Sequence, residues 1–110
     1  MAVFLVRLIG PRPTFPFDMT DAEGAVMARH FAHCQALAEE GAGIAFGPVL
    51  DPSGPWGLGL IEAEDEAALD AILARDPVIT EGHGFRYEKI AMPNIILRPG
   101  LASRPAADVS

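Results

Sequence analysis

The chain has 110 residues, a formal net charge of −7 and a hydrophobic content of 50%. This length predicts one domain, since domains centre on about 100–150 residues, and so apolar a composition excludes a disordered chain. Phosphate groups and anionic lipids are bound by clustered Lys and Arg, but the eight basic residues here are scattered. We therefore expect neither nucleic acid nor a membrane as a partner. The single cysteine, Cys34, excludes an intramolecular disulfide and favours a reducing, cytoplasmic location.

The first half of the chain predicts a strand, a loop and a long helix. Residues 3–9 are β-branched and aromatic, which is typical of a strand, and a proline-rich loop follows over residues 10–19. Thr20 and Glu23 form the pattern of a capping box, and the helix that they open ends at Gly41. At about 100° per residue, one side of this helix predicts a buried face: Val26, Met27, His30, Phe31, Cys34, Leu37 and Ala38.

The second half predicts two more strands, a second helix and a last strand. Strands are expected over residues 43–50 and 56–62, separated by turn residues. Asp65 is placed to cap a helix over residues 66–75, which Asp76 and Pro77 end. A strand over residues 85–92 follows, with a short fifth strand expected at 95–97. We expect a single domain over residues 1–98 and a mobile tail over residues 99–110.

The order β-α-β-β-α-β predicts an α+β fold of the ferredoxin-like kind, with an antiparallel sheet and both helices on one face. The first strand is apolar on both sides except for Arg7, so the face without helices also needs a cover. The sheet of a second copy is the simplest cover. We therefore expect a homodimer through sheet faces.

His30 and Asp76 are the strongest candidates for chemistry. An imidazole exchanges protons near neutral pH, but a histidine on a buried helix face can equally be a hydrogen-bonded core residue. Asp76 follows the second helix, where a negative charge is unfavourable, so it could serve the imidazole. It could also cap the next turn, with Pro77 in the first helical position. One carboxylate can do both.

The other polar candidates carry weaker signals. His30 and His33 could share a metal ion with a carboxylate, but two histidines at this spacing indicate little, and we expect no metal. Cys34 is expected to pack in the core, and His83 stands between two glycines as a candidate for substrate contact. Arg7 could pair with an acidic side chain across the sheet or hold a substrate carboxylate.

The spacing of these residues resembles the YCII-related (YciI-like) proteins. His30 stands eleven positions before Gly41, Phe46-Gly47-Pro48 lies in the second strand, and the helix opened at Asp65 closes eleven positions later at Asp76. The last strand ends near Pro93, so the resemblance covers roughly residues 3–93. It implies a dimeric α/β-barrel protein that pairs through its sheets and carries a His–Asp pair in a cleft. These two family positions fall on His30 and Asp76.

The resemblance also implies a range of activities. The family is similar in fold to muconolactone isomerases, and one branch is linked to removal of chloride from a hydroxylated aromatic ring. The long loop over residues 10–19 departs from the family pattern, so no substrate is carried over from it.

We consider three functions. An enzyme without a cofactor would use His30 and Asp76 for proton transfer in isomerisation, elimination or dehydrochlorination of a small cyclic or aromatic acid. Its acid group would be held by Arg7 or Arg12, and its apolar part would contact Phe15, Phe17 and Trp56. A dimer that binds a small molecule without turnover is the second possibility. The third is a regulatory or structural dimer in which the pair only ties helix to helix.

Overall fold

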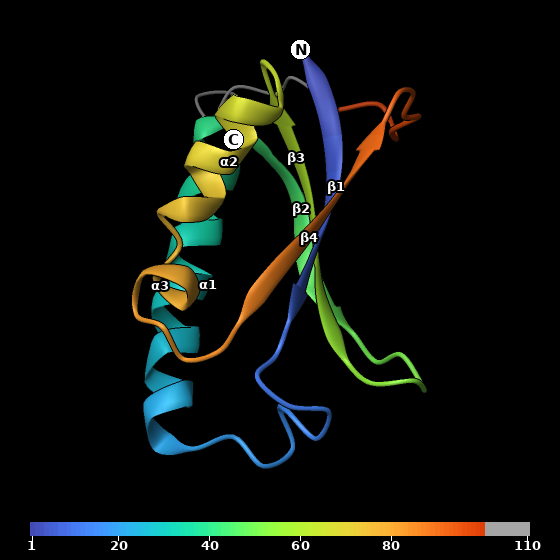
Figure 1. Cartoon of the computed structure of the whole chain (residues 1–110). Helices are drawn as coiled ribbons and strands as arrows, with labels where there is room; N and C mark the ends of the chain where they lie inside the picture. The colour runs from blue at the N-terminus through green and yellow to red at the C-terminus, as the bar shows by residue number, and fades with distance from the viewer. Residues whose placement is uncertain (101–110) are drawn as a thin grey trace.

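One antiparallel sheet carries the fold, and the helices cover one of its faces (Figure 1). In the computed structural model, which describes residues 1–100, the strands are β1 (Ala2–Ile9), β2 (Gly43–Val49), β3 (Trp56–Ala63) and β4 (Arg86–Met92). The helices are α1 (Asp21–Glu40), α2 (Glu66–Ala74) and the single turn α3 (Pro77–Thr80). The strand order is β2-β3-β1-β4, and every neighbouring pair is antiparallel. These observations confirm the predicted α+β, ferredoxin-like fold.

The register of β1 decides which side chains meet the helices. Val6 pairs with Gly59 of β3 and with Lys89 of β4, and Leu8 pairs with Gly57 and Tyr87. Side chains alternate between the two faces of a strand. On the helix side of the sheet, β1 buries Phe4, Val6 and Leu8. Phe4 and Val6 belong to an apolar cluster with residues of α2, and Leu8 belongs to a second cluster with residues of α1, α3 and the loop before α1.

The first helix begins and ends as its residues predict. The hydroxyl of Thr20 accepts a hydrogen bond from the backbone N–H of Glu23 at 3.1 Å, and the Glu23 carboxylate accepts from the Thr20 N–H at 2.9 Å. Gly41 ends the helix with a φ of +93°, in the left-handed region that suits glycine. Arg12 also donates two hydrogen bonds of 2.8 Å to Glu23, which ties the loop over residues 10–19 to this helix.

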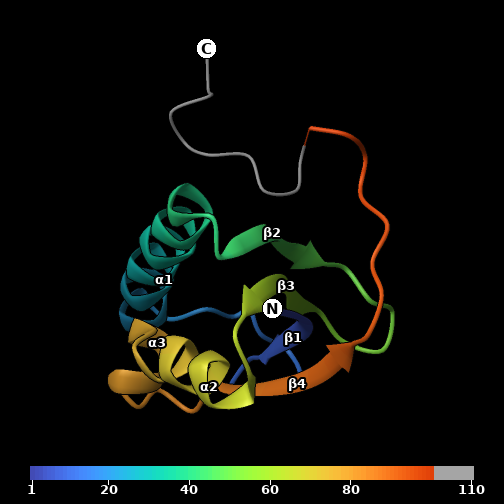
Figure 2. The same cartoon turned by 90° about the horizontal axis from the view of Figure 1, so that it is seen from above.

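The fifth strand expected at residues 95–97 is wrong, because β4 ends at Met92 and residues 93–98 form no strand. Pro93 follows directly, and it has no N–H with which to continue a ladder. In Figures 1 and 2 the segment after β4 lies on the side of the sheet away from the helices. The tail expected over residues 99–110 lies outside the described residues, apart from its first two positions.

The face of the sheet opposite the helices is largely apolar. Leu5 of β1 is paired with Leu60 of β3 and with Ile90 of β4, and Ile90 is 55% exposed. Arg7 lies on the same face and pairs with Glu88 at 3.3 Å. Among helices within residues 1–100, none combines the length and apolar composition needed to cross a lipid bilayer.

Candidate active site

A cavity of about 560 Å³ lies between α1 and the helix-facing side of the sheet. Two glycines of β3 leave this space open, because Gly57 and Gly59 are paired with Leu8 and Val6 on that side of the sheet. A Cβ atom at Gly59 would lie 2.8 Å from a methyl carbon of Val6, closer than real contacts allow. Because these two positions carry no side chain, a space is left between the sheet and α1.

The cavity explains why part of the expected buried face of α1 is exposed. Phe31 and Ala38 were expected to be buried, but Phe31 is 65% exposed and Ala38 is also exposed. That expectation was wrong. Both residues border the cavity instead of packing on side chains of the sheet. Val26, Cys34 and Leu37 are buried as expected.

His30 and Asp76 meet at the wall of this cavity. The Nδ1 atom of the His30 ring lies 2.7 Å from the Oδ2 atom of Asp76, although the two residues are 46 positions apart. The hydroxyl of Tyr87, on β4, donates to the same carboxylate oxygen at 2.6 Å. The side chain of Asp76 is 1% exposed and that of His30 15% exposed. Three elements, α1, β4 and the start of α3, thus converge on one buried carboxylate.

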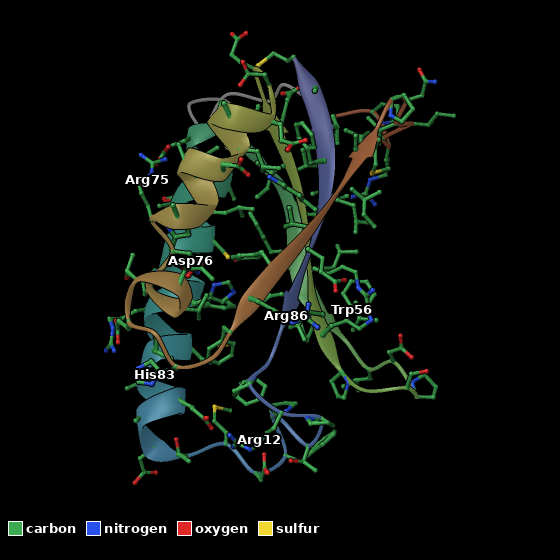
Figure 3. All side chains as sticks on the ribbon, viewed as in Figure 1. Arg12, Trp56, Arg75, Asp76, His83 and Arg86 are labelled. Atoms are coloured by element: carbon green, nitrogen blue, oxygen red, sulfur yellow. The ribbon has the colours of Figure 1, made fainter. Side chains whose placement is uncertain are left out.

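Local structure fixes the position of the Asp76 carboxylate. Its Oδ1 atom accepts a hydrogen bond from the backbone N–H of Val78 at 3.1 Å, which caps α3, and Pro77 follows at the first helical position. The cap and the contact with His30 use different oxygens, so the two roles foreseen for Asp76 occur together. In Figure 3, Asp76 lies on the helix side of the sheet.

The surroundings shift the pKa of each group in the cluster. Burial lowers the pKa of His30, but the hydrogen bonds with Asp76 and Cys34 outweigh it and raise the pKa to about 9. Burial opposes ionisation of Asp76, yet the hydrogen bonds from His30 and Tyr87 hold its pKa below the usual value. Burial, with the nearby Asp76 charge, raises the pKa of Tyr87 above its ordinary value. At neutral pH the pair is therefore an imidazolium and a carboxylate.

Cys34 lies one helical turn from His30 and borders the same cavity. Its sulfur lies within weak hydrogen-bond distance of both ring nitrogens of His30, 3.6 Å from Nε2 and 3.9 Å from Nδ1. His30, Cys34 and Asp76 offer possible metal-ligand atoms within 4.8 Å of one another. A metal ion would have to displace the short His30–Asp76 hydrogen bond, and the observed bonding already satisfies these groups. His33 lies apart from this cluster, beside Arg75 and Glu40.

Two of the expected substrate contacts border the cavity. Phe15 closes one end of it and packs edge-on against Phe85, with ring centroids 5.1 Å apart and planes at 88°. Trp56 also borders it, but its indole lies 4.4 Å from the Arg7 guanidinium and donates to Asp51 at 3.0 Å. Figure 3 places Trp56 and Asp76 on opposite sides of the sheet.

The structure does not bring the other four expected contacts to the cavity. Phe17 is 78% exposed, and Arg12 is held by Asp18 and Glu23. His83 lies in the loop before β4 with its Nε2 atom 3.6 Å from Glu81 (Figure 3). Arg7 faces the other side of the sheet, paired with Glu88 as in the first interpretation of this residue.

Tyr87 is the functional candidate that sequence reasoning missed. It is the only tyrosine of the chain, and it stands in the expected last strand between the charged residues Arg86 and Glu88. This alternation indicates an inward-facing polar group, which needs a hydrogen-bond partner when buried. The partner itself could not be predicted, because the register that brings β4 beside Asp76 comes from the tertiary fold.

The chain thus has a ferredoxin-like α+β fold with a His–Asp pair beside an apolar cavity. The model of the YCII-related domain matches residues 3–92. The chain therefore belongs to the YCII-related domain family, and the resemblance inferred from the sequence is confirmed. No curated protein matches the chain.

Proposed function

We propose that the protein is an enzyme that transfers a proton to or from a small cyclic or aromatic molecule, with His30 as the acid/base group. The observation that carries this proposal is the buried His30–Asp76 ion pair at the wall of an apolar cavity. Titratable groups that face a cavity and have shifted pKa values are typical of catalytic sites. Isomerisation, elimination and dehydrochlorination all include such a proton transfer. No cofactor enters this scheme.

His30 would act first as an acid. Asp76 occupies Nδ1, so a ligand would bind at Nε2, where it would replace the weak contact with the Cys34 sulfur at 3.6 Å, and at neutral pH this nitrogen carries a proton. For a ketone ligand, Nε2–H would donate to the carbonyl oxygen while a proton on the adjacent carbon leaves to solvent, which gives an enol. Asp76 holds the ring orientation and stabilises its positive charge. A positioned acid of this kind accelerates proton transfer by about 10²–10⁴-fold.

Solvent deuterium exchange tests the acid/base role without a known substrate. We expect the protein to accelerate exchange of the protons next to the carbonyl of 4-tert-butylcyclohexanone in D₂O, followed by NMR. His30→Gln should lose about 10²-fold of the acceleration, because glutamine cannot give up a proton. The matched control is His33→Gln, on the same helix but outside the cavity, which should keep the full rate. An unchanged rate in His30→Gln would refute the role of His30.

A ligand-binding protein without turnover is the alternative, and the positive charge of His30 at neutral pH favours it, because an imidazolium cannot accept a proton. Binding of a ketone with no exchange above the buffer rate would support this alternative. The single cysteine fits a cytoplasmic setting for either function.

We further propose that the protein is a homodimer in which the open sheet faces meet. Leu5, Leu60 and Ile90 form a continuous apolar row across three strands of that face. Exposed apolar patches of this kind in small proteins are typical of interfaces. A second copy offers an identical apolar face, which suits a two-fold contact.

Light scattering coupled to size exclusion should give twice the chain mass of 11.7 kDa. Ile90→Glu, which puts a charge into the apolar row, should yield the monomer. Phe17→Glu is the matched control, because Phe17 is 78% exposed and lies in the loop before α1 and not on the sheet. A wild-type monomer at micromolar concentration would overturn the dimer.

A further inference from the structure

The lining of the cavity contains almost no charge. Within residues 1–100, it includes no arginine, lysine, aspartate or glutamate side chain. Its polar side chains are His30, Cys34, Gln35, Trp56 and Tyr87, and the Trp56 indole and the Tyr87 hydroxyl already donate to Asp51 and Asp76. The remaining lining is aliphatic, aromatic, proline or glycine. A ligand in this space therefore meets mainly carbon where it faces the protein, and the exposed residues Phe31, Gln35 and Ala38 border the side that opens to solvent.

The arginines that could hold an acid group are engaged elsewhere. Arg12 donates to both carboxylate oxygens of Glu23 at 2.8 Å and to Asp18 at 2.9 Å. Arg7 donates to Glu88 and stacks on Trp56. Neither guanidinium borders the cavity, and either would have to leave its partners to reach it.

The positive charge of His30 does not replace a missing arginine. Asp76 lies 2.7 Å away with the opposite charge, so the pair has no net charge. Burying a carboxylate is costly unless it is paired with a cation, and here the nearest cation is already neutralised. A carbonyl or hydroxyl oxygen, in contrast, needs a single donor, and the Nε2 atom of His30 is the ring nitrogen that Asp76 leaves free.

From this arrangement we infer that the cavity selects an uncharged alicyclic or aromatic ligand with a carbonyl or hydroxyl oxygen against His30, and that it rejects carboxylic acids. The inference deepens the proposed function and rests on the same site, but it replaces the acid expected from the sequence. A space of about 560 Å³ is of the size that binds small organic molecules.

Two matched ligands test this selectivity by isothermal titration calorimetry of the wild-type chain at pH 7. 4-tert-Butylcyclohexanone and 4-tert-butylcyclohexanecarboxylate share one apolar body and differ in the charge of the polar group. We expect the ketone to bind at least about tenfold more tightly, because the buried carboxylate would lack a cation. Equal or tighter binding of the carboxylate would overturn the inference, and so would failure of both ligands to bind.

A substitution at the cavity border tests the physical cause. Gln35 borders the cavity and is exposed, so an arginine fits there without entering the core. Gln35→Arg should tighten carboxylate binding about tenfold or more and so remove the preference for the ketone. Gln35→Met, of similar length and no charge, is the control. If Gln35→Arg leaves the carboxylate affinity unchanged, the missing cation is not the reason for the selectivity and the inference fails.

These measurements are separate from the test of catalysis. Ketone selectivity without deuterium exchange would leave the inferred ligand class in place and remove the proposed enzyme. Deuterium exchange on the ketone together with preference for the carboxylate would support the proposed enzyme and overturn the inferred ligand class.

Discussion

Asp76→Ala is expected to lower the free energy of unfolding by about 3 kcal/mol, the usual effect of removing one partner of a buried ion pair. The substitution leaves the His30 imidazolium and the Tyr87 hydroxyl without their shared acceptor. It also removes the cap of α3, since Oδ1 of Asp76 accepts from the Val78 N–H. Urea denaturation followed by circular dichroism at pH 7 measures the change.

Two further variants separate the contributions of Asp76. Asp76→Asn keeps an oxygen that can cap α3 but loses the charge, so it should fall between the wild type and Asp76→Ala. Asp70→Ala makes the same change on the exposed side of α2, where within residues 1–100 the carboxylate pairs with Lys89 alone, and should have a small effect. If Asp76→Ala and Asp70→Ala prove equal, the buried carboxylate does not stabilise the fold.

The stability of the protein should fall on the alkaline side as His30 loses its proton. Because folding raises the pKa of His30 from 6.5 to about 9, its contribution is fully present below pH 6.5 and is lost as the pH rises through about 9. Each pKa unit corresponds to about 1.4 kcal/mol, so the loss is on the order of 3 kcal/mol. Urea denaturation at a series of pH values between 6 and 10 measures it.

The neighbours of His30 set the limits of this pH window. Asp76 has a lowered pKa, so its contribution is present above its ordinary value of 3.8 and is lost as the pH falls through the lower folded value. The raised pKa of Tyr87 keeps its hydroxyl protonated across the range, and Cys34 is the other titratable group against the ring. His30→Gln should remove the alkaline slope. Cys34→Ser should retain it, which assigns the slope to the imidazole.

Much of the fold could be predicted because its signals are local. The capping box at Thr20 and Glu23 and the glycine at 41 mark both ends of α1 within a few residues of sequence. The side-chain composition of residues 3–9 was likewise sufficient for β1. Residues 95–97 show the limit of this reasoning, since an apolar triplet has strand composition but Pro93 and the sheet edge leave it unpaired.

The contact between His30 and Asp76 was predictable because Asp76 carried two independent signals. Asp76 stood out because an acidic residue after a helix is unfavourable unless it has a partner, and the family spacing pointed to the same position. The proximity of Phe17, Arg12 and His83 to the site could not be judged, because the path of the loops depends on tertiary contacts such as those of Arg12 with Glu23. The cavity could not be predicted either, because it requires Gly57 and Gly59 to lie on the helix side of β3. The pairing of β3 with β1 determines which side that is.

The His30–Asp76 pair and the space beside it are set by different residues. A Cβ atom at Gly57 would lie 3.4 Å from Leu8, an ordinary contact, whereas the same atom at Gly59 would collide with Val6. Position 57 therefore has room for a Cβ atom, whereas position 59 has none unless Val6 moves. A substitution at position 57 would thus change the size of ligand that fits, while the His30–Asp76 contact on the opposite wall stays as it is.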